Sequence, residues 1–272
     1  MALSAQQINF FETFGFLVFP NLLSDDIGWI TDEFTTIHNT ASGPKHDGTK
    51  RTCIVPFIDQ SAKMCSLLDH RDIVEIAASL LGADFNYLGG DGNYYTGDTG
   101  WHSDGWHDTG LFIKMALYLD PVRKDSGCLR VIPGSQVLGN NWLLKVRDVN
   151  RSREAFGIEP SAVPAVPLES NPGDLVVFNH NLHHAAFGGN NSRRMFTLNL
   201  SHHAETEPQI ADLTGYINSH GRFWLDQLHS RTMRETASPE RMRHLQQIIE
   251  LEGGLADASA RCRASMAEPS RG

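Results

Sequence analysis

The chain of 272 residues has few cysteines and no paired ones. Cys53, Cys65, Cys128 and Cys262 form no C-x-x-C pair, and their spacing matches neither a zinc ribbon nor a disulfide framework. Because stable disulfides belong to oxidising compartments, we expect isolated, reduced thiols in a cytoplasmic protein.

Long apolar runs and an excess of basic residues are also absent. No stretch approaches the roughly eighteen apolar residues of a membrane span, and residues 1–20 have no basic region before their apolar part. We therefore expect neither a membrane span nor a signal peptide. The net charge of −9 argues against nucleic acid or an anionic membrane as the main partner, because both need clustered cations. We expect a small-molecule substrate instead, and self-association as a homodimer stays open.

Turn-forming residues, by contrast, are plentiful, with 24 glycines and 12 prolines. Between residues 84 and 205, short apolar runs alternate with turns rich in Gly, Asp, Asn and Pro. This pattern is typical of a β-sandwich or a small barrel, jelly rolls included. The strand-like runs are 86–88, 93–95, 111–119, 128–132, 175–178 and 194–200.

Helical patterns flank this β-rich region on both sides. Residues 1–83 predict helices and one short strand at 15–20, and residues 206–255 predict further helices. The small, polar residues of 256–272 predict a disordered tail. We therefore expect one domain of 272 residues, mainly β in its core, with helices around it.

Two His-x-Asp triplets occur, at residues 70–72 and 102–104. On a strand, residues two apart face the same side and can meet one metal ion, whereas on a helix they diverge. The first triplet opens a helix expected to run to Leu81, where Asp69 or Asp72 caps the first turn. The second follows a predicted strand, so His102 and Asp104 are the candidate ligands.

A second imidazole is available from a distant segment, which contains His180, His183 and His184. Two histidines and one carboxylate form the face that holds non-heme Fe(II) and leaves other coordination positions open. The strand that begins at Leu175 is expected to end near His183. Strand alternation therefore does not choose between His183 and His184.

Arg193 and Arg194 follow this segment at the start of the last predicted strand. Alternation places Arg194 on one face with apolar residues and Arg193 on the other, with Met195, Thr197 and Asn199. The second face is the more polar and suits a pocket. An arginine fork there would match the carboxylate of an acidic co-substrate.

Four motif-bearing segments appear in one order between about residues 8 and 203. They are Trp-His-Ser-Asp at 101–104, Met-Ala-Leu-Tyr-Leu-Asp at 115–120, Ser-Gly-Cys-Leu-Arg-Val-Ile-Pro-Gly-Ser at 126–135, and Gly-Asp-Leu-Val-Val-Phe at 173–178 followed by His-Ala-Ala-Phe-Gly-Gly and Arg-Arg-Met-Phe-Thr-Leu-Asn. Together they resemble the phytanoyl-CoA dioxygenase family, of which ectoine hydroxylase is a relative. One departure is Gln136, where relatives often have a histidine that is not a metal ligand.

The resemblance implies a double-stranded β-helix (jelly roll, cupin-like) and dependence on Fe(II), 2-oxoglutarate and O2. It makes His184 the distal ligand beside His102 and Asp104, because the family's ligand opens the His-Ala-Ala-Phe-Gly-Gly type of turn. It also makes Arg193 the partner of the far 2-oxoglutarate carboxylate. The remaining candidates for cofactor binding are Asn93 and Thr197.

Candidates for the substrate pocket are Trp106 and His107, which follow the ligand triplet. Arg51, Phe57 and Asp59 are further candidates from the N-terminal part of the chain. A structural role for the tryptophan is equally compatible with the sequence.

The hypothesis is therefore an oxygenase that hydroxylates an unactivated C–H bond of a small polar metabolite or biosynthetic intermediate, with release of succinate and CO2. One alternative is a zinc-dependent hydrolase or isomerase with the same three ligands, which would have no need for Arg193. Another is a metal-free, cupin-like binding protein in which the histidines are core residues.

Overall fold

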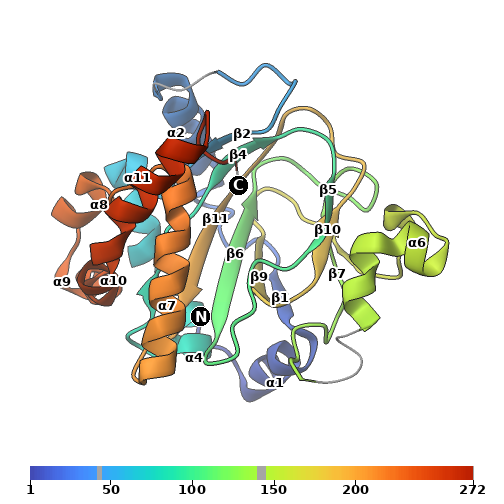
Figure 1. Cartoon of the computed structure of the whole chain (residues 1–272), viewed down its shortest axis with the longest axis horizontal. Coiled ribbons are helices and arrows are strands. Elements are labelled where there is room, and N and C mark those ends of the chain that lie inside the picture. The colour runs from blue at the N-terminus through green and yellow to red at the C-terminus, as the bar shows by residue number, and fades with distance from the viewer. Residues whose placement is uncertain (42–44, 140–144, 272) are drawn as a thin grey trace.

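The computed structural model describes residues 1–41, 45–139 and 145–271. Two antiparallel sheets face each other in the middle of the molecule, and helices from both ends of the chain gather beside them (Figure 1). This is the predicted jelly roll, although the helices outside it contain more residues than the strands.

The larger sheet is built around its longest strands, which lie next to one another. Its order is β1 (Phe16–Phe19), β9 (Leu175–Asn179), β6 (Phe112–Tyr118), β11 (Arg193–Ser201), β4 (Gly92–Tyr95) and β2 (Thr52–Ile54), with β3 (Asn86–Tyr87) also paired to β11. Since β1 and β2 come from the first 83 residues, the jelly-roll core is not confined to residues 84–205 as the sequence predicted.

The smaller sheet contains two of the predicted metal ligands, His102 and His184. Its order is β5 (Thr99–His102), β10 (His184–Ala186), β7 (Leu129–Val131) and β8 (Val166–Leu168). Between the two sheets lies an interior of mostly apolar side chains from both, including Tyr118, Val131 and Phe178.

Strand alternation divides the side chains of β6 between two cores. Met115 and Leu117 point to the helices and pack in one cluster with α2 (Ile27–Thr40) and α4 (Arg71–Leu81). Ala116 and Tyr118 point between the sheets. The period of two residues thus separates the supporting core from the barrel interior.

The remaining helices cover the outside of the barrel. They are α1 (Ala5–Phe14), α3 (Ala62–Cys65), α6 (Ser152–Phe156), α7 (Glu207–Ser219), α8 (Arg231–Glu235), α9 (Pro239–Arg243), α10 (Gln246–Leu251) and α11 (Leu255–Ser265). Short 3-10 helices lie between them, among them η5 (His220–Phe223). Within the described ranges, none of the helices combines the length and the apolar character needed to cross a bilayer.

The prediction of a disordered tail from residue 256 is wrong for most of that segment, which forms α11. Leu255, Ala258 and Ser259 are buried, and the Ser259 hydroxyl donates to the carbonyl of Leu225. The close approach of α11 to Gly221 on η5 leaves no room for a side chain there. Tertiary packing therefore stabilises a helix whose composition alone suggested disorder.

The first His-x-Asp triplet lies at the start of α4, as expected, but neither aspartate caps that helix. The N-cap residue is His70, and it makes no side-chain capping bond. Asp69 is bonded to Arg241, and Asp72 pairs with the N-terminal ammonium of Met1. Both carboxylates are paired with cations that are distant in the sequence, which local sequence rules do not consider.

Candidate metal centre

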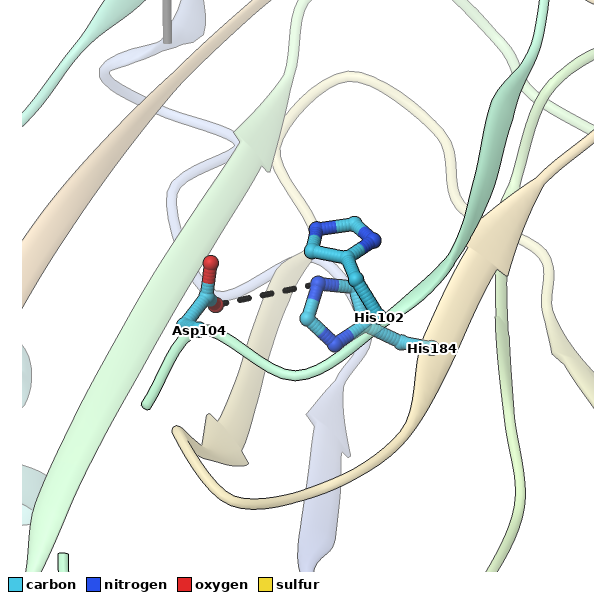
Figure 2. Close-up of side chains that lie close together, drawn as sticks. All are labelled: His102, Asp104 and His184. Carbon is cyan, nitrogen blue, oxygen red and sulfur yellow. Dashed lines mark ion pairs between the residues drawn. The ribbon is translucent and has the colours of Figure 1, made fainter. Parts of the chain in front are cut away.

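Strand pairing brings the two predicted histidines together. β5 ends with His102 and β10 begins with His184, and the two residues are direct partners in the antiparallel ladder. Their ring centroids are 4.2 Å apart. Asp104 follows on the next turn, where its backbone N–H donates to the carbonyl of His180 at 2.8 Å. Figure 2 shows the carboxylate of Asp104 facing the two imidazoles.

The hydrogen bonds of both rings leave the same nitrogen free to bind a metal ion. Nδ1 of His102 lies 2.8 Å from the carbonyl oxygen of Gly100, and Nδ1 of His184 lies 2.8 Å from that of Leu182. A carbonyl only accepts, so Nδ1 carries the proton and each Nε2 keeps its lone pair. Metal-binding histidines are oriented in this way by their outer hydrogen bonds.

The donor atoms of His102, Asp104 and His184 lie within 4.8 Å of one another. Oδ2 of Asp104 is 3.7 Å from Nε2 of His184, and it is buried with no hydrogen-bond partner among the described residues. Two bare imidazole nitrogens and one unsatisfied carboxylate oxygen around one point are a donor set suited to Fe(II) or Zn(II).

Asp104 and His184 already carry the charges that metal binding requires. Burial by itself would raise the pKa of Asp104, but Lys114 and the nearby histidines hold that pKa well below its usual range. Burial and the neighbouring His102 lower the pKa of His184 to about 3. The carboxylate is therefore ionised and His184 is neutral at pH 7.

The other two histidines of the distal segment do not join the cluster. His183 is buried away from the cavity, with its ring centroid 5.7 Å from that of Trp106. His180 contributes its backbone carbonyl to the turn that carries Asp104. The choice that strand alternation left open is thus made by the register of β10 against β5.

A cavity of about 810 Å³ opens beside the cluster. Besides the cluster itself, β11 contributes Arg193 and Thr197 to its wall, and the helical side contributes residues from α7 and η5. The described residues from that side are Asp212, Gly215, Tyr216, Ser219, His220, Arg222 and Phe223. The C-terminal helices therefore form one wall of the cavity.

The two adjacent arginines have opposite environments. Arg193 is only 2% exposed, and its Nε and Nη1 find no hydrogen-bond partner within the described ranges. Its guanidinium lies 5.0 Å from the ring centroid of Tyr95. Arg194 instead points out of the barrel and pairs with Asp120 at 2.6 Å. A buried cation without a partner is costly, and an anionic ligand in the cavity would satisfy it.

The two further candidates for cofactor binding are placed differently from one another. Thr197 lines the cavity, and its hydroxyl donates to Asp91. Asn93 does not line it, and instead bonds to Arg51 and Asp91, which do. The Asn93 carbonyl oxygen accepts from Nε of Arg51 at 2.8 Å, and its amide nitrogen donates to Asp91. Asn93 thus supports the wall of the cavity from behind.

Among the substrate-pocket candidates, His107 lines the cavity and Trp106 does not. Trp106 is 41% exposed and lies under the guanidinium of Arg147 at 3.9 Å. The ring of His107 stacks on Phe112 at 3.6 Å, and its Nδ1 is 3.0 Å from Asp212 on α7.

Of the N-terminal candidates, only Arg51 reaches the cavity. Its Nη2 pairs with Asp91 at 2.8 Å. Phe57 is buried in the core between sheet and helices, and Asp59 is buried with bonds to Tyr87 and Ser230. Both are structural residues here.

Sequence reasoning missed Lys114 and, on the helical wall, Asp212 and Tyr216, although the C-terminal helices with Phe223 were among the elements that could close over the site. Lys114 lies in β6, and its Nζ donates to Oδ1 of Asp104 at 2.7 Å. The signal for it was present, because a lysine interrupts the apolar run 111–119. Asp212 and Tyr216 gave no comparable signal, since polar residues on a helix are usually solvated.

The fold and the cluster together define a jelly-roll protein with a metal-binding face of two histidines and one carboxylate. The chain belongs to the phytanoyl-CoA dioxygenase family, whose model matches residues 11–195. A comparison with curated protein sequences finds no significant match. The predicted family membership is confirmed, and the helical wall from α7 onward lies outside the matched range.

Similar solved structures include three proteins of this fold. HygX from Streptomyces hygroscopicus, with nickel and 2-oxoglutarate bound, has a TM-score of 0.59 and 18% identity over 76% of this chain and 90% of its own. EctD from S. alaskensis with bound Fe has a TM-score of 0.56 and 21% identity, over 74% of this chain and 77% of its own. SnoK, an alpha-ketoglutarate-dependent carbocyclase from nogalamycin biosynthesis, has a TM-score of 0.57 and 19% identity, over 74% of this chain and 84% of its own. At these identities the likeness shows the shared jelly-roll fold.

Proposed function

We propose that the protein is an Fe(II)- and 2-oxoglutarate-dependent oxygenase. One observation carries the proposal: the buried Arg193, whose Nε and Nη1 have no hydrogen-bond partner among the described residues, faces the same cavity as the three candidate metal donors. Family membership supports the same cofactors. A zinc hydrolase or a metal-free binding protein would leave Arg193 without a role.

Each residue has a defined task in this proposal. His102 and His184 would hold the metal through Nε2, and Asp104 would hold it through Oδ2. Arg193 would hold the far carboxylate of 2-oxoglutarate, and Thr197, on the same face of β11, would contribute to the co-substrate site from the same wall. When bound, Fe(II) with 2-oxoglutarate and O2 supplies the oxidation of a C–H bond and releases succinate and CO2. The protein positions the target carbon and keeps water away from it.

We propose hydroxylation of a small polar metabolite or biosynthetic intermediate as the reaction. The helical wall of the cavity supports a polar substrate, because it presents Asp212, Tyr216, Ser219 and Arg222 to the cavity. His107, tied to α7 through Asp212, is the substrate-binding residue nearest the metal ligands in sequence. Other outcomes occur on this fold, since SnoK is described as a carbocyclase and SnoN as an epimerase.

Mixing the protein with Fe(II) and 2-oxoglutarate without oxygen tests the cofactors directly. We expect a visible charge-transfer band that saturates with 2-oxoglutarate, followed by slow succinate release in air. Succinate instead of 2-oxoglutarate is the control and should give no band. A protein that shows neither band nor succinate, but hydrolyses ester or amide substrates with Zn(II), would support the zinc alternative.

Gly189 gives a second test, because it packs against the guanidinium of Arg193. A Cβ at Gly189 would lie 2.1 Å from Nη1 of Arg193 and 2.6 Å from the carbonyl oxygen of Gly97. Gly189→Ala should therefore displace the guanidinium and weaken 2-oxoglutarate binding by roughly tenfold or more, a loss of about 1.4 kcal/mol. Titration of the charge-transfer band measures this.

The control for this change is Gly253→Ala, where a Cβ would meet nothing within 4 Å. We expect it to bind 2-oxoglutarate like the wild type. Equal affinity of the Gly189→Ala protein for 2-oxoglutarate would show that the guanidinium does not hold the co-substrate.

A further inference from the structure

Strand β6 places a lysine inside the barrel. Lys114 shares its strand face with Phe112, Ala116 and Tyr118, all of which are buried, and its side chain is only 16% exposed. Its neighbour on β9 is Phe178, whose ring centroid lies 6.0 Å from Nζ. An ammonium group in such a place is destabilising unless a nearby anion compensates its charge.

The anion that compensates Lys114 is the carboxylate of Asp104. Nζ lies 2.7 Å from Oδ1, and both side chains are more than four-fifths buried, with 16% and 17% exposure. Lys114 also lowers the pKa of Asp91, but that carboxylate has its own ion-pair partner in Arg51, at 2.8 Å. Nε2 of His184 lies 3.7 Å from the second oxygen of Asp104, which is beyond hydrogen-bond distance. Lys114 is therefore the cation that Asp104 contacts directly.

The two oxygens of this carboxylate thus have different surroundings. Oδ1 accepts from Lys114, while Oδ2 faces the imidazole of His184 and has no hydrogen-bond partner among the residues described. A carboxylate fixed in this way offers one oxygen to a metal ion. The lysine also supplies positive charge where a metal ion would otherwise be needed to neutralise a buried anion.

We propose that Lys114 is a positioning residue for the metal ligand Asp104, an inference that rests on the proposed function. It occupies Oδ1, so that Asp104 binds metal through Oδ2 alone. It also compensates the carboxylate before metal arrives, so that the site is assembled without metal. Since the bound metal is itself a cation, Lys114 opposes its binding, and the stability of the metal-free site comes with a weaker metal affinity.

The experiment compares Lys114→Met with the wild type by thermal unfolding and by titration with CoCl2 alone. Methionine keeps the length of the side chain and removes its charge. Without metal, we expect Lys114→Met to unfold roughly 6–12 °C lower, because it leaves a buried carboxylate uncompensated. With Co(II), most of this loss should disappear, and Co(II) should bind about tenfold more tightly than to the wild type. The visible Co(II) spectrum should also change, because Oδ1 is released.

Three further variants separate positioning from a packing role. Lys114→Arg keeps the cation and should restore the wild-type Co(II) affinity and spectrum. Lys63→Met removes an amine that lies 5.0 Å from the Trp29 ring, and should change neither the Co(II) affinity nor the Co(II) spectrum. Lys114→Met combined with Asp104→Asn should be more stable than Lys114→Met alone, which also keeps the test informative where the single variant folds poorly.

The outcomes distinguish the inference from the proposed function. Equal loss of thermal stability with and without Co(II), with unchanged or weaker Co(II) binding and an unchanged spectrum, would overturn the role of Lys114. If the wild type binds Co(II) but gives no charge-transfer band with Fe(II) and 2-oxoglutarate, the oxygenase fails while the role of Lys114 toward a metal stands. If the wild type binds no metal, both fail.

Discussion

His184→Ala should abolish turnover, with a loss of at least about a thousandfold, while His183→Ala keeps most of it. The two residues are adjacent in sequence, but only His184 lies opposite His102 in the strand ladder and directs a bare Nε2 toward Asp104. Removing it takes away one of three metal donors. Succinate release in air, measured at saturating Fe(II) and 2-oxoglutarate, gives the comparison.

His183 is the matched control because its ring is equally buried. Its loss should lower thermal stability, since the ring packs near Trp106 at 5.7 Å between centroids, without changing the charge-transfer band. An active His184→Ala protein and an inactive His183→Ala protein would show that the wrong histidine had been assigned to the metal.

Arg193→Ala should weaken 2-oxoglutarate binding by roughly 30- to 150-fold, corresponding to about 2–3 kcal/mol for lost bonds to a charged group. The guanidinium is buried, lies in the cavity, and has Nε and Nη1 without partners among the described residues. Titration of the anaerobic band with 2-oxoglutarate measures the affinity, and Fe(II) affinity without the co-substrate should be unchanged.

Arg194→Ala separates this effect from a general loss of charge. It removes the pairing with Asp120, in which the two side chains are 26% and 32% exposed, so we expect a small loss of stability and unchanged affinity. Arg193→Ala should not lower the stability of the metal-free protein in the same way, because it removes a buried cation that lacks compensation. Similar 2-oxoglutarate affinities for the two variants would refute the assignment of Arg193.

Much of the site follows from local periodicity in the sequence. The spacing of two residues between His102 and Asp104 places Asp104 on the turn directly after the strand that His102 ends. The same period separates Arg193, which faces the cavity, from Arg194, which does not. Such patterns are readable because a strand fixes the direction of each side chain within a few residues.

Other parts of the site depend on contacts that periodicity does not encode. The side chain of Arg51 bonds to that of Asn93. Asn93 therefore lies behind the cavity wall, although it stands on the strand that the sequence predicted. Trp106 directly follows the ligand turn but packs under Arg147. Each outcome depends on a partner about forty residues away, which no local pattern specifies.

By itself, the sequence determined the family, the jelly-roll core and the segments that carry the site. Only the tertiary structure decided which distal histidine meets His102, which cation compensates Asp104, and which helices close the cavity. The physical reason is that alternation along a strand is set by neighbouring residues. The register between strands and the docking of α7 and α11 are set instead by packing between segments far apart in the chain.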